Sequence, residues 1–422
     1  MLNFKKIGNM KNFKINIFLS MLAFFAINSC EGPLEEEIFS QLAPSTLLIN
    51  EGGINTVLTS AYASAHYDNE STLRWSVFNG DFIAGTYWGK GGSIESIWVQ
   101  LMEFTFDANH ASVRNLWPNH YEGIRDANVV LENLDNESLS TDYVNLTTAE
   151  AKFIRGWNYV QLYSLFGPVP LHISASDEAL QARATDAEMR TQIESDLIDA
   201  MNTLPVSTDK FGKATKGAAQ GLLTKYYLNT KQWQKAADMA KTIISSGNYA
   251  LQATFQDVFA FTNEGNKEMV WALPNDSGSG NKLMALQSLT YPPSYPRPYS
   301  NNAVWAARTY MFDSFVDSFE AGDERKNSII QQWNTADGTP QQAYGFDQSL
   351  PAKFPFDPNS LAWRSGNDFP VVRYADVLLS AAEAINEVSG PTQEAIDYIN
   401  QVRARAKISS LTLAGFTKES LR

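Results

Sequence analysis

Apolar residues recur at helical spacing along most of the chain after residue 50. The pattern is clear over residues 51–66 and 113–134, and again over the segment AEAKFIRGWNYVQLYSLFG at 149–167. Apolar positions three and four residues apart form a stripe along one face of a helix, and that stripe must pack against another element. We therefore expect a mainly α-helical protein.

Capping signals predict the starts of two helices, the one at 149–167 and another that begins after residue 185. Thr147 is followed three residues later by Glu150, and Thr185 by Glu188. In a capping box, the first side chain accepts a hydrogen bond from the third helical N–H and the glutamate returns the bond. Both pairs therefore predict a helix start, and Gly167, followed by proline, predicts the end of the first helix.

Two pairs of helices follow each other closely enough to form helical hairpins. A tetratricopeptide unit packs two antiparallel helices in about 34 residues, with small residues where the helices approach. Leu223, Tyr227, Ala236 and Ala240 occupy positions where such a unit needs a large, an aromatic and two small residues. The four predicted helices are KGAAQGLLTKYYLNT (216–230), WQKAADMAKTIISSGNYAL (233–251), VVRYADVLLSAAEAINEVSG (371–390) and PTQEAIDYINQVRARA (391–406).

The composition of the sequence changes between the two predicted hairpins. Residues 274–370 contain ten of the seventeen prolines, and only residues around 303–320 predict a helix there. A segment of this length inside a domain is usually functional or disordered, and its aromatic content argues against disorder. We expect a mainly α fold: a TPR-like superhelix of helical hairpins that carries a loop-rich, irregular insertion.

The N-terminus carries an export signal. Four lysines between positions 5 and 14 precede an apolar run at 15–27, and Cys30, the only cysteine, follows directly and is itself followed by glutamates. The run is too short to span a bilayer comfortably, and Ile27-Asn28-Ser29-Cys30 is typical of a lipobox. We expect lipidation at Cys30; an ordinary signal peptide with a free cysteine nearby is the alternative.

Charge and composition limit the classes of partner that the protein is expected to bind. The formal net charge of −13 repels nucleic acid and anionic headgroups, so the lipid alone should hold the protein at a membrane. The four histidines show no metal-binding spacing, and we expect neither a metal nor a cofactor. Aromatic residues make up 12% of the chain, which favours a surface that stacks on a ligand.

Several long segments together resemble the SusD/RagB family. They are the helix at 149–167 with its proline-rich exit, the paired helices at 216–251, and the segment DFPVVRYADVLLSAAEAINEVSG with AIDYINQVRARA. The resemblance runs from the leader to the last residue, and the acidic run after Cys30 resembles the surface-export signals of such lipoproteins. Relatives usually continue past TKESLR, so we expect a C-terminally truncated chain.

The resemblance implies a biological role. Family members are outer-membrane, surface-exposed lipoproteins that bind oligosaccharides or other nutrients, cap a TonB-dependent (SusC-like) channel and are not enzymes. It also implies four regions: a signal peptide at 1–29, an acidic tether at 30–50, a SusD-like helical region at 51–270 and a RagB/SusD C-terminal region at 271–422.

Two stretches have the composition of a sugar-binding surface, on local chemistry alone. Aromatic faces cover the C–H patches of sugars, while amides and carboxylates satisfy the hydroxyls. The stretches are RWSVFNGDFIAGTYWGKGG and TYPPSYPRPYSNNAVW. They also contain the polar residues Arg74, Arg297, Asn301 and Asn302. The ligand-binding candidates are Trp75, Asn79, Asp81, Tyr87, Trp88, Tyr291, Tyr295, Tyr299 and Trp305.

Alternatives remain at this point. These aromatic residues could simply pack the insertion onto the helices, and we expect Trp117, Trp157 and Trp233, which lie on predicted helices, to be core residues. The protein could bind peptides, or serve as a pure scaffold for the channel. A surface glycoside hydrolase would need two carboxylates about 5–10 Å apart across a cleft, and no motif nominates such a pair.

Overall fold

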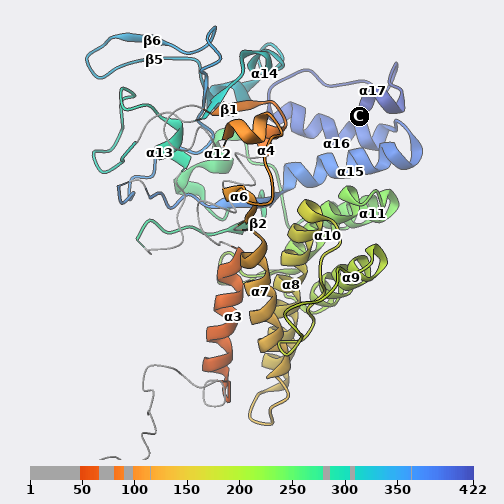
Figure 1. Ribbon diagram of the computed structural model, residues 1–422. Helices are drawn as coiled ribbons and strands as arrows, with labels where there is room; N and C mark the ends of the chain where they lie inside the picture. Colours follow the sequence, from red (N-terminus) through yellow and green to blue (C-terminus); the bar gives the residue numbers. More distant parts are fainter. Residues whose placement is uncertain are drawn as a thin grey trace, which may run out of the picture. The chain divides into compact units, whose positions relative to one another are not determined.

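Seven long helices pack in the order in which they occur in the sequence. They are α3 (Glu51–Ala65), α7 (Leu116–Glu132), α8 (Thr141–Phe166), α9 (Asp186–Thr203), α10 (Lys216–Asn229), α11 (Trp233–Ser245) and α15 (Tyr374–Ser389). The computed structural model describes residues 48–65, 80–89, 98–114, 116–278, 286–304, 309–362 and 364–422, and residues 48–422 form one compact unit. Each of these helices contacts the next, and α16 (Gln393–Arg405) packs on α15. Figure 1 shows α3, α7 and α8 side by side and the later helices stacked beyond them.

Close helix packing depends on two glycines. A side chain at Gly123 of α7 would collide with Ser64 of α3 and with Asn158 of α8. A side chain at Gly156 of α8 would collide with Leu197 of α9. Glycine at these positions lets the helix backbones approach closely, at a cost in helix propensity of about 1 kcal/mol each.

A buried ion pair locks α8 to α9. Arg155 donates from Nε and Nη2 to the two carboxylate oxygens of Asp196 at 2.8 and 2.7 Å, and both side chains are buried. Arg155 Nη1 also donates to Oδ1 of Asn128 on α7 at 2.8 Å. Because all three partners are out of water, removal of one leaves a buried polar group unsatisfied.

The irregular insertion consists of short elements. Its helices are α13 (Leu286–Thr290), α14 (Asp313–Asp317) and η3 (Glu324–Ser328), and its strands are β3 (Thr309–Met311), β4 (Ile329–Ile330), β5 (Gln332–Asn334), β6 (Pro340–Gln342) and β7 (Leu350–Pro351). The remaining elements are α4 (Gly80–Ile83), β1 (Tyr87–Gly89), α6 (Ala111–Arg114), α12 (Phe255–Phe259), η2 (Phe261–Asn263), β2 (Met269–Leu273), β8 (Phe369–Arg373) and α17 (Lys418–Leu421), with a further helical turn at 98–102.

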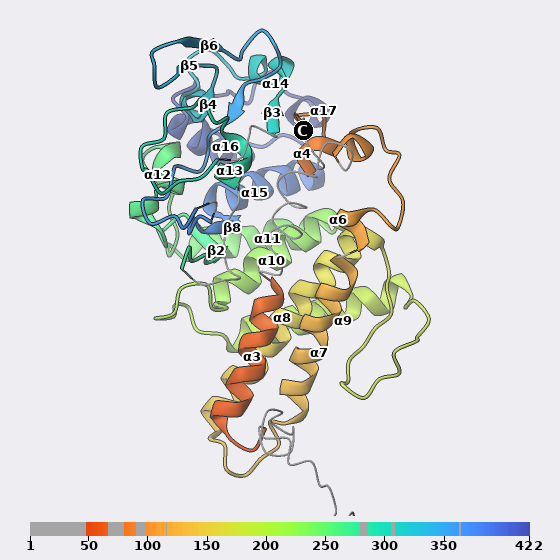
Figure 2. The ribbon, with the colours of Figure 1, turned by 60° about the vertical axis from the view of Figure 1, so that its left-hand side comes forward.

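Four two-stranded antiparallel sheets hold the insertion together. β4 pairs with β7, and β5 pairs with β6. β1 pairs with β3, which joins the early segment to the insertion, and β2 pairs with β8, which leads directly into α15. Figures 1 and 2 show this group of elements together beside α15 and α16. The fold is therefore the expected TPR-like helical superhelix with a loop-rich insertion.

Two details of the sequence analysis are wrong. Helix α8 begins at Thr141, with Ser140 accepting a hydrogen bond from the N–H of Tyr143, so Thr147 and Glu150 lie inside the helix. The capping box of Thr185 and Glu188, by contrast, is confirmed.

The helix expected at 303–320 is also wrong. Among the described residues of this range, Thr309–Met311 forms β3 instead, and only Asp313–Asp317 is helical. Pairing with β1 decides this local structure, because β-branched and aromatic residues suit a strand once a partner strand is present.

Candidate functional site

A groove opens between a proline-rich loop and a hairpin turn in the insertion. The loop follows α13, the turn joins β5 to β6, and the groove has a volume of about 560 Å³. Its lining residues are Pro293, Ser294, Tyr295, Pro296, Arg297, Tyr299, Ser300, Thr335, Ala336 and Asp337. We call it the loop groove.

A row of stacked aromatic rings supports this loop groove from within. Tyr291 is buried and stacks on Phe356, with ring centroids 4.4 Å apart and planes inclined by 27°. Tyr295 is half-buried, 4.7 Å from Tyr291 and 6.0 Å from Trp333 between ring centroids. Tyr295 therefore presents part of its surface to the groove while its remaining surface is fixed by packing.

Tyr299 is the most accessible aromatic residue of the groove, with 40% of its surface exposed. The loop that carries it is closed by Arg297, whose Nη1 donates to the carbonyl oxygen of Asn302 at 2.7 Å. Prolines and this hydrogen bond restrict the loop before any ligand arrives, which lowers the entropy cost of binding.

The asparagines that follow the loop have a structural role. Asn301 donates from Nδ2 to the carbonyl oxygens of Pro358 and Ser360 at 2.9 and 2.8 Å. Asn302 is buried and donates to the carbonyl oxygen of Asp357 at 2.8 Å. Their amide N–H groups therefore anchor the loop.

Asp337 brings a carboxylate to the opposite wall of the loop groove. Hydrogen bonds from the side chain of Thr335 and from Thr339, whose N–H lies 3.1 Å from Oδ1, lower the pKa of Asp337 to about 2. The carboxylate is therefore ionised throughout the neutral range and can accept hydrogen bonds from hydroxyl groups.

The strand pair β1–β3 brings the first predicted stretch to the same aromatic cluster. Trp88 stacks on Tyr310, with centroids 4.9 Å apart, and donates from Nε1 to the carbonyl oxygen of Asp347. Tyr310 packs in the cluster that contains Tyr291 and Tyr295. Two stretches more than 200 residues apart in the sequence thus share one aromatic cluster.

The other predicted site residues fall in different places. Tyr87 is half-buried between two core clusters, and burial raises the pKa of its hydroxyl. Asp81 lines a separate pocket, and burial raises the pKa of its carboxyl. Trp75, Asn79 and Trp305, together with Cys30, lie outside the residues that the structure describes.

The sequence analysis missed Trp333 and Asp337 as members of this site. They lie in QWNTADGTPQQ, where an Asp-Gly pair between two short runs is the strongest local signal for a hairpin turn. That signal could have predicted the turn. Nothing in the sequence could have placed it against the loop at 293–300.

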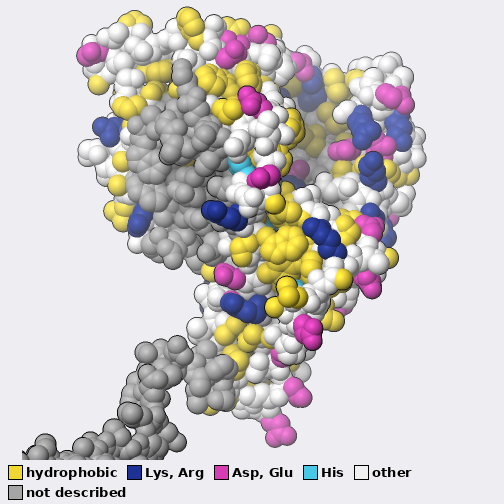
Figure 3. Space-filling model, viewed as in Figure 1, with side chains coloured by type: hydrophobic (Ala, Val, Ile, Leu, Met, Phe, Trp, Pro, Cys, Tyr) yellow, Lys and Arg dark blue, Asp and Glu magenta, His cyan; other side chains and the backbone are white. Residues whose placement is uncertain are grey.

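The prediction that the helix tryptophans are core residues is wrong for two of the three. Trp157 is buried, but Trp117 and Trp233 are only half-buried. Trp117 lines a groove of about 580 Å³ with Tyr121 and with Leu180, which is 93% exposed. Figure 3 shows hydrophobic side chains gathered over the region between α6 and α10, flanked by lysine or arginine side chains.

Two other kinds of feature are absent from the part of the chain that the structure describes. There, no cluster of three or more histidine, cysteine, aspartate or glutamate side chains has the arrangement of a metal site. Within the same part of the chain, no helix combines the length and the apolar character needed to cross a bilayer.

Comparisons with known proteins agree on one family. A family model described as "Starch-binding associating with outer membrane" matches residues 35–228, and the model of the SusD family matches residues 333–421. The SusD-like protein P25 of Formosa agariphila is 27% identical over 93% of this chain and 81% of its own length. A SusD-like protein of Bacteroides ovatus is 24% identical over 82% of this chain and 69% of its own length.

Solved structures show the same fold. A SusD homolog from Bacteroides thetaiotaomicron superposes with a TM-score of 0.76 at 24% identity, covering 90% of this chain and 83% of its own. Surface glycan-binding protein A from the same species, in complex with laminarihexaose, gives 0.74 at 18% identity, covering 88% and 85%. The chain belongs to the SusD/RagB family.

Proposed function

We propose that this protein is a cell-surface glycan-binding lipoprotein that captures an oligosaccharide in the loop groove and delivers it to a TonB-dependent outer-membrane transporter. The observation that carries the proposal is the combination of exposed Tyr299 and half-buried Tyr295 in a stiff groove, supported by Tyr291, Phe356 and Trp333. A scaffold that bound only a protein partner would not need this surface.

The groove offers the two kinds of contact that a sugar needs. The rings of Tyr295 and Tyr299 can cover the C–H faces of a sugar, while the Asp337 carboxylate accepts hydrogen bonds from its hydroxyls. Because the aromatic row behind Tyr295 is packed, little side-chain entropy is lost on binding. Trp88 stacks on Tyr310, which packs in the cluster of Tyr291 and Tyr295, whereas Tyr87 packs in two other core clusters. Trp75, Asn79 and Trp305 remain candidates from the sequence alone.

The names of similar proteins suggest which ligands to try first. One neighbour was solved with laminarihexaose, another is described as a laminarin-binding SusD-like protein, and one matching family is described as starch-binding. These proteins are less than 30% identical to this chain, so they guide the choice of probes and do not identify the ligand.

The membrane attachment and the transporter partner rest on the leader and on the family. The lysine-rich leader, the apolar run and Cys30 support acylation at Cys30 after removal of residues 1–29. Metabolic labelling with a radioactive fatty acid, compared between wild type and Cys30→Ala, tests the lipid anchor. Co-purification of a SusC-like channel from outer membranes tests the partner.

Isothermal titration against a glycan panel tests the binding function. The panel contains laminari- and malto-oligosaccharides, cello-oligosaccharides, xylan fragments and, as the peptide alternative, a mixture of tripeptides. We expect saturable binding of one glycan class. Binding of peptides alone, or silence across the panel by folded protein that still co-purifies with the channel, would favour the peptide or the scaffold alternative.

The hydrolase alternative has its own test. Because we propose a binder and not an enzyme, we expect no release of reducing sugar from the bound glycan over a day of incubation. Release at a rate proportional to protein concentration would support the hydrolase.

A further inference from the structure

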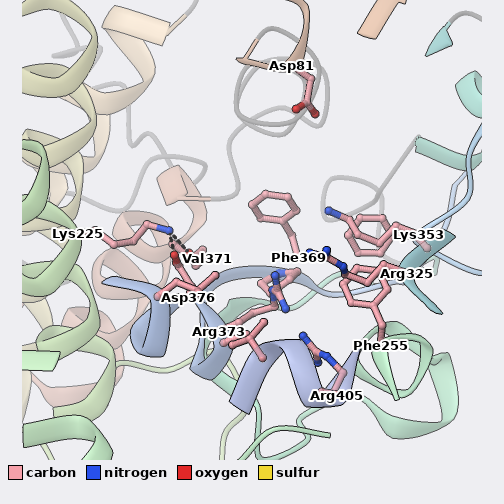
Figure 4. A pocket seen from close by; sticks show the side chains of 15 residues that line it. Asp81, Lys225, Phe255, Arg325, Lys353, Phe369, Val371, Arg373, Asp376 and Arg405 are labelled. Carbon is pink, nitrogen blue, oxygen red and sulfur yellow. Dashed lines mark hydrogen bonds and ion pairs between the residues drawn. The ribbon is translucent and has the colours of Figure 1, made fainter. Parts of the chain in front are cut away.

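Another pocket, which shares no lining residue with the loop groove or with the groove of Trp117, carries an excess of positive charge, and we call it the basic pocket. It has a volume of about 410 Å³ and its walls include Phe255, Phe354 and Phe369. Figure 4 shows the nitrogen-bearing ends of several cationic side chains gathered in it. The charged residues that line it are Asp81, Lys225, Arg325, Lys353, Arg373, Asp376 and Arg405.

Two of the carboxylates that balance these cations are turned away from the pocket. The Glu268 side chain has 0% exposure and is shared by Arg373 and Arg405, at 3.0 and 3.1 Å. The Asp323 side chain, also 0% exposed, pairs with Arg325. Both carboxylates therefore lie behind the arginines, and the pocket wall itself presents five cationic groups and two carboxylates.

One of the arginines has an unused donor. The Arg405 side chain is only 4% exposed and its guanidinium lies 5.4 Å from the centre of the Phe255 ring. Its Nη1 donates to Glu268, but its Nε is buried and has no hydrogen-bond partner among the described residues. An unsatisfied buried donor destabilises the folded state by about 1–3 kcal/mol, and by more when the group is charged. An acceptor bound in the pocket would satisfy this donor and remove the destabilisation.

Lys353 adds a cation whose charge interacts with those of Arg373 and Asp81. With the described residues it forms no ion pair, and its Nζ lies 5.3 and 5.4 Å from the ring centres of Phe259 and Phe354. Although the residue as a whole is exposed, its ammonium lies over these two rings and near Arg373. A cation in this position is stabilised by an added negative charge.

We propose that this pocket binds an oxyanion group, either a sulfate or the carboxylate of a sugar acid. Lys353 and Arg405 supply charge and the unused N–H donor, while Arg325 and Arg373 complete the positive wall. The phenylalanines exclude water from the bound group, which strengthens each charge-assisted hydrogen bond. In a chain of net charge −13, such a pocket selects anions that the rest of the surface repels. This proposal does not depend on glycan binding in the loop groove.

Isothermal titration with simple anions tests the proposal. Wild-type protein is titrated with inorganic sulfate, with D-glucuronate and with neutral D-glucose, in chloride buffers of constant ionic strength. We expect saturable binding of sulfate or glucuronate and none of glucose. Binding of sulfate alone identifies a sulfate ester as the group, and binding of glucuronate alone identifies a carboxylate.

Two variants link the binding to this pocket. Lys353→Gln removes a charge that forms no ion pair with the described residues, and we expect at least a fivefold loss of anion affinity. Lys225→Gln removes a cation of the same wall that is already paired with Asp376 at 2.6 Å, so we expect a smaller loss of about twofold. Lys210→Gln makes the same change of net charge at an exposed position outside the pocket and should leave the affinity unchanged.

Two outcomes would overturn the proposal. One is the absence of saturable heat from both anions, with wild type shown to be folded by its thermal transition. The other is equal anion affinity of wild type, Lys353→Gln and Lys225→Gln. If Lys353→Gln fails to fold, the Lys225→Gln and Lys210→Gln pair decides the question.

Discussion

The indole of Trp88 on β1 stacks on the ring of Tyr310 on β3, with their centroids 4.9 Å apart and their planes inclined by 29°. The same indole donates from Nε1 to the carbonyl oxygen of Asp347. Asp347 in turn accepts a hydrogen bond at Oδ1 from the N–H of Asp313, at the start of α14. Trp88 therefore ties the early segment of the chain to two parts of the insertion, and we expect it to stabilise this region without contacting the glycan.

Trp88→Phe tests this supporting role. The variant keeps an aromatic ring for Tyr310 but removes the N–H that bonds to Asp347, so we expect a loss of about 1–2 kcal/mol in the free energy of unfolding. We expect the affinity for the glycan found in the panel to stay within twofold. A tenfold loss of affinity with an unchanged unfolding midpoint would instead place Trp88 in contact with the glycan.

The buried pair of Arg155 and Asp196 should dominate the stability of the helical scaffold. Arg155→Ala leaves a buried carboxylate without its cation, so we expect a loss of about 3–5 kcal/mol in urea unfolding. Lys152→Ala breaks a pair between the same two helices, Lys152 with Asp199, that is largely open to water, and should cost less than about 1 kcal/mol. Equal effects of the two variants would contradict the account of the scaffold.

Asp368 should make stability depend on pH. Burial raises the pKa of this carboxyl to about 6 although the N–H of Asn275 donates to it at 3.1 Å. A pKa that is higher in the folded state contributes stability that is present below pH 3.8 and is lost as the pH rises through 6.

Asp368→Asn removes this ionisation while keeping the amide oxygen as an acceptor. We expect the variant to match wild type at pH 4 and to exceed it by about 1–3 kcal/mol at pH 7.5 in urea unfolding. Asp209→Asn, at an exposed position, is the matched control and should show no such difference. A stability gain for Asp368→Asn that is equal at both pH values would contradict the assignment.

Anion binding in the basic pocket should weaken in alkaline solution. Removal from water and the nearby Arg373 lower the pKa of Lys353 to about 8, so the free ammonium loses its proton between pH 7 and pH 9. Because the anion binds the charged form, we expect sulfate affinity to fall about fivefold over this range. The other charged groups that face this pocket are Asp81, Lys225, Arg325, Arg373, Asp376 and Arg405.

Lys353→Arg checks that the pH effect belongs to this residue. An arginine stays protonated across the range, so its sulfate affinity should be independent of pH from 7 to 9. A pH dependence that persists in Lys353→Arg would assign the titration to another group.

The periodicity of apolar residues predicted the scaffold well because it depends on local spacing. The hairpin of α10 and α11 buries Leu223, Tyr227, Ala236 and Ala240, as the pattern of large and small residues indicated. The start of α8 was placed seven residues too late, near 148 instead of 141, because Thr147 and Glu150 have the spacing of a capping box but are both buried inside the helix. A sequence motif cannot reveal that an earlier residue, Ser140, caps the helix first.

The candidate site could be predicted only in part. The composition of the two stretches identified Tyr295 and Tyr299, since exposed aromatic residues among prolines have a local signature. The same composition could not show that Tyr291 is buried or that Asn301 and Asn302 bond to distant carbonyl groups. Asp81 was grouped with Trp88 because they are close in sequence, yet Asp81 lines the basic pocket. Tertiary contacts decide these roles.

The affinity of the double variant Tyr295→Ala/Tyr299→Ala tests the central claim most directly. The measurement is isothermal titration with the glycan identified in the panel, beside wild type and Phe346→Ala, which removes a more exposed aromatic ring of the insertion outside the loop groove. We predict at least a tenfold loss for the double variant, about 1.4 kcal/mol or more, and no change for Phe346→Ala. Wild-type affinity in a folded double variant would contradict binding in the loop groove.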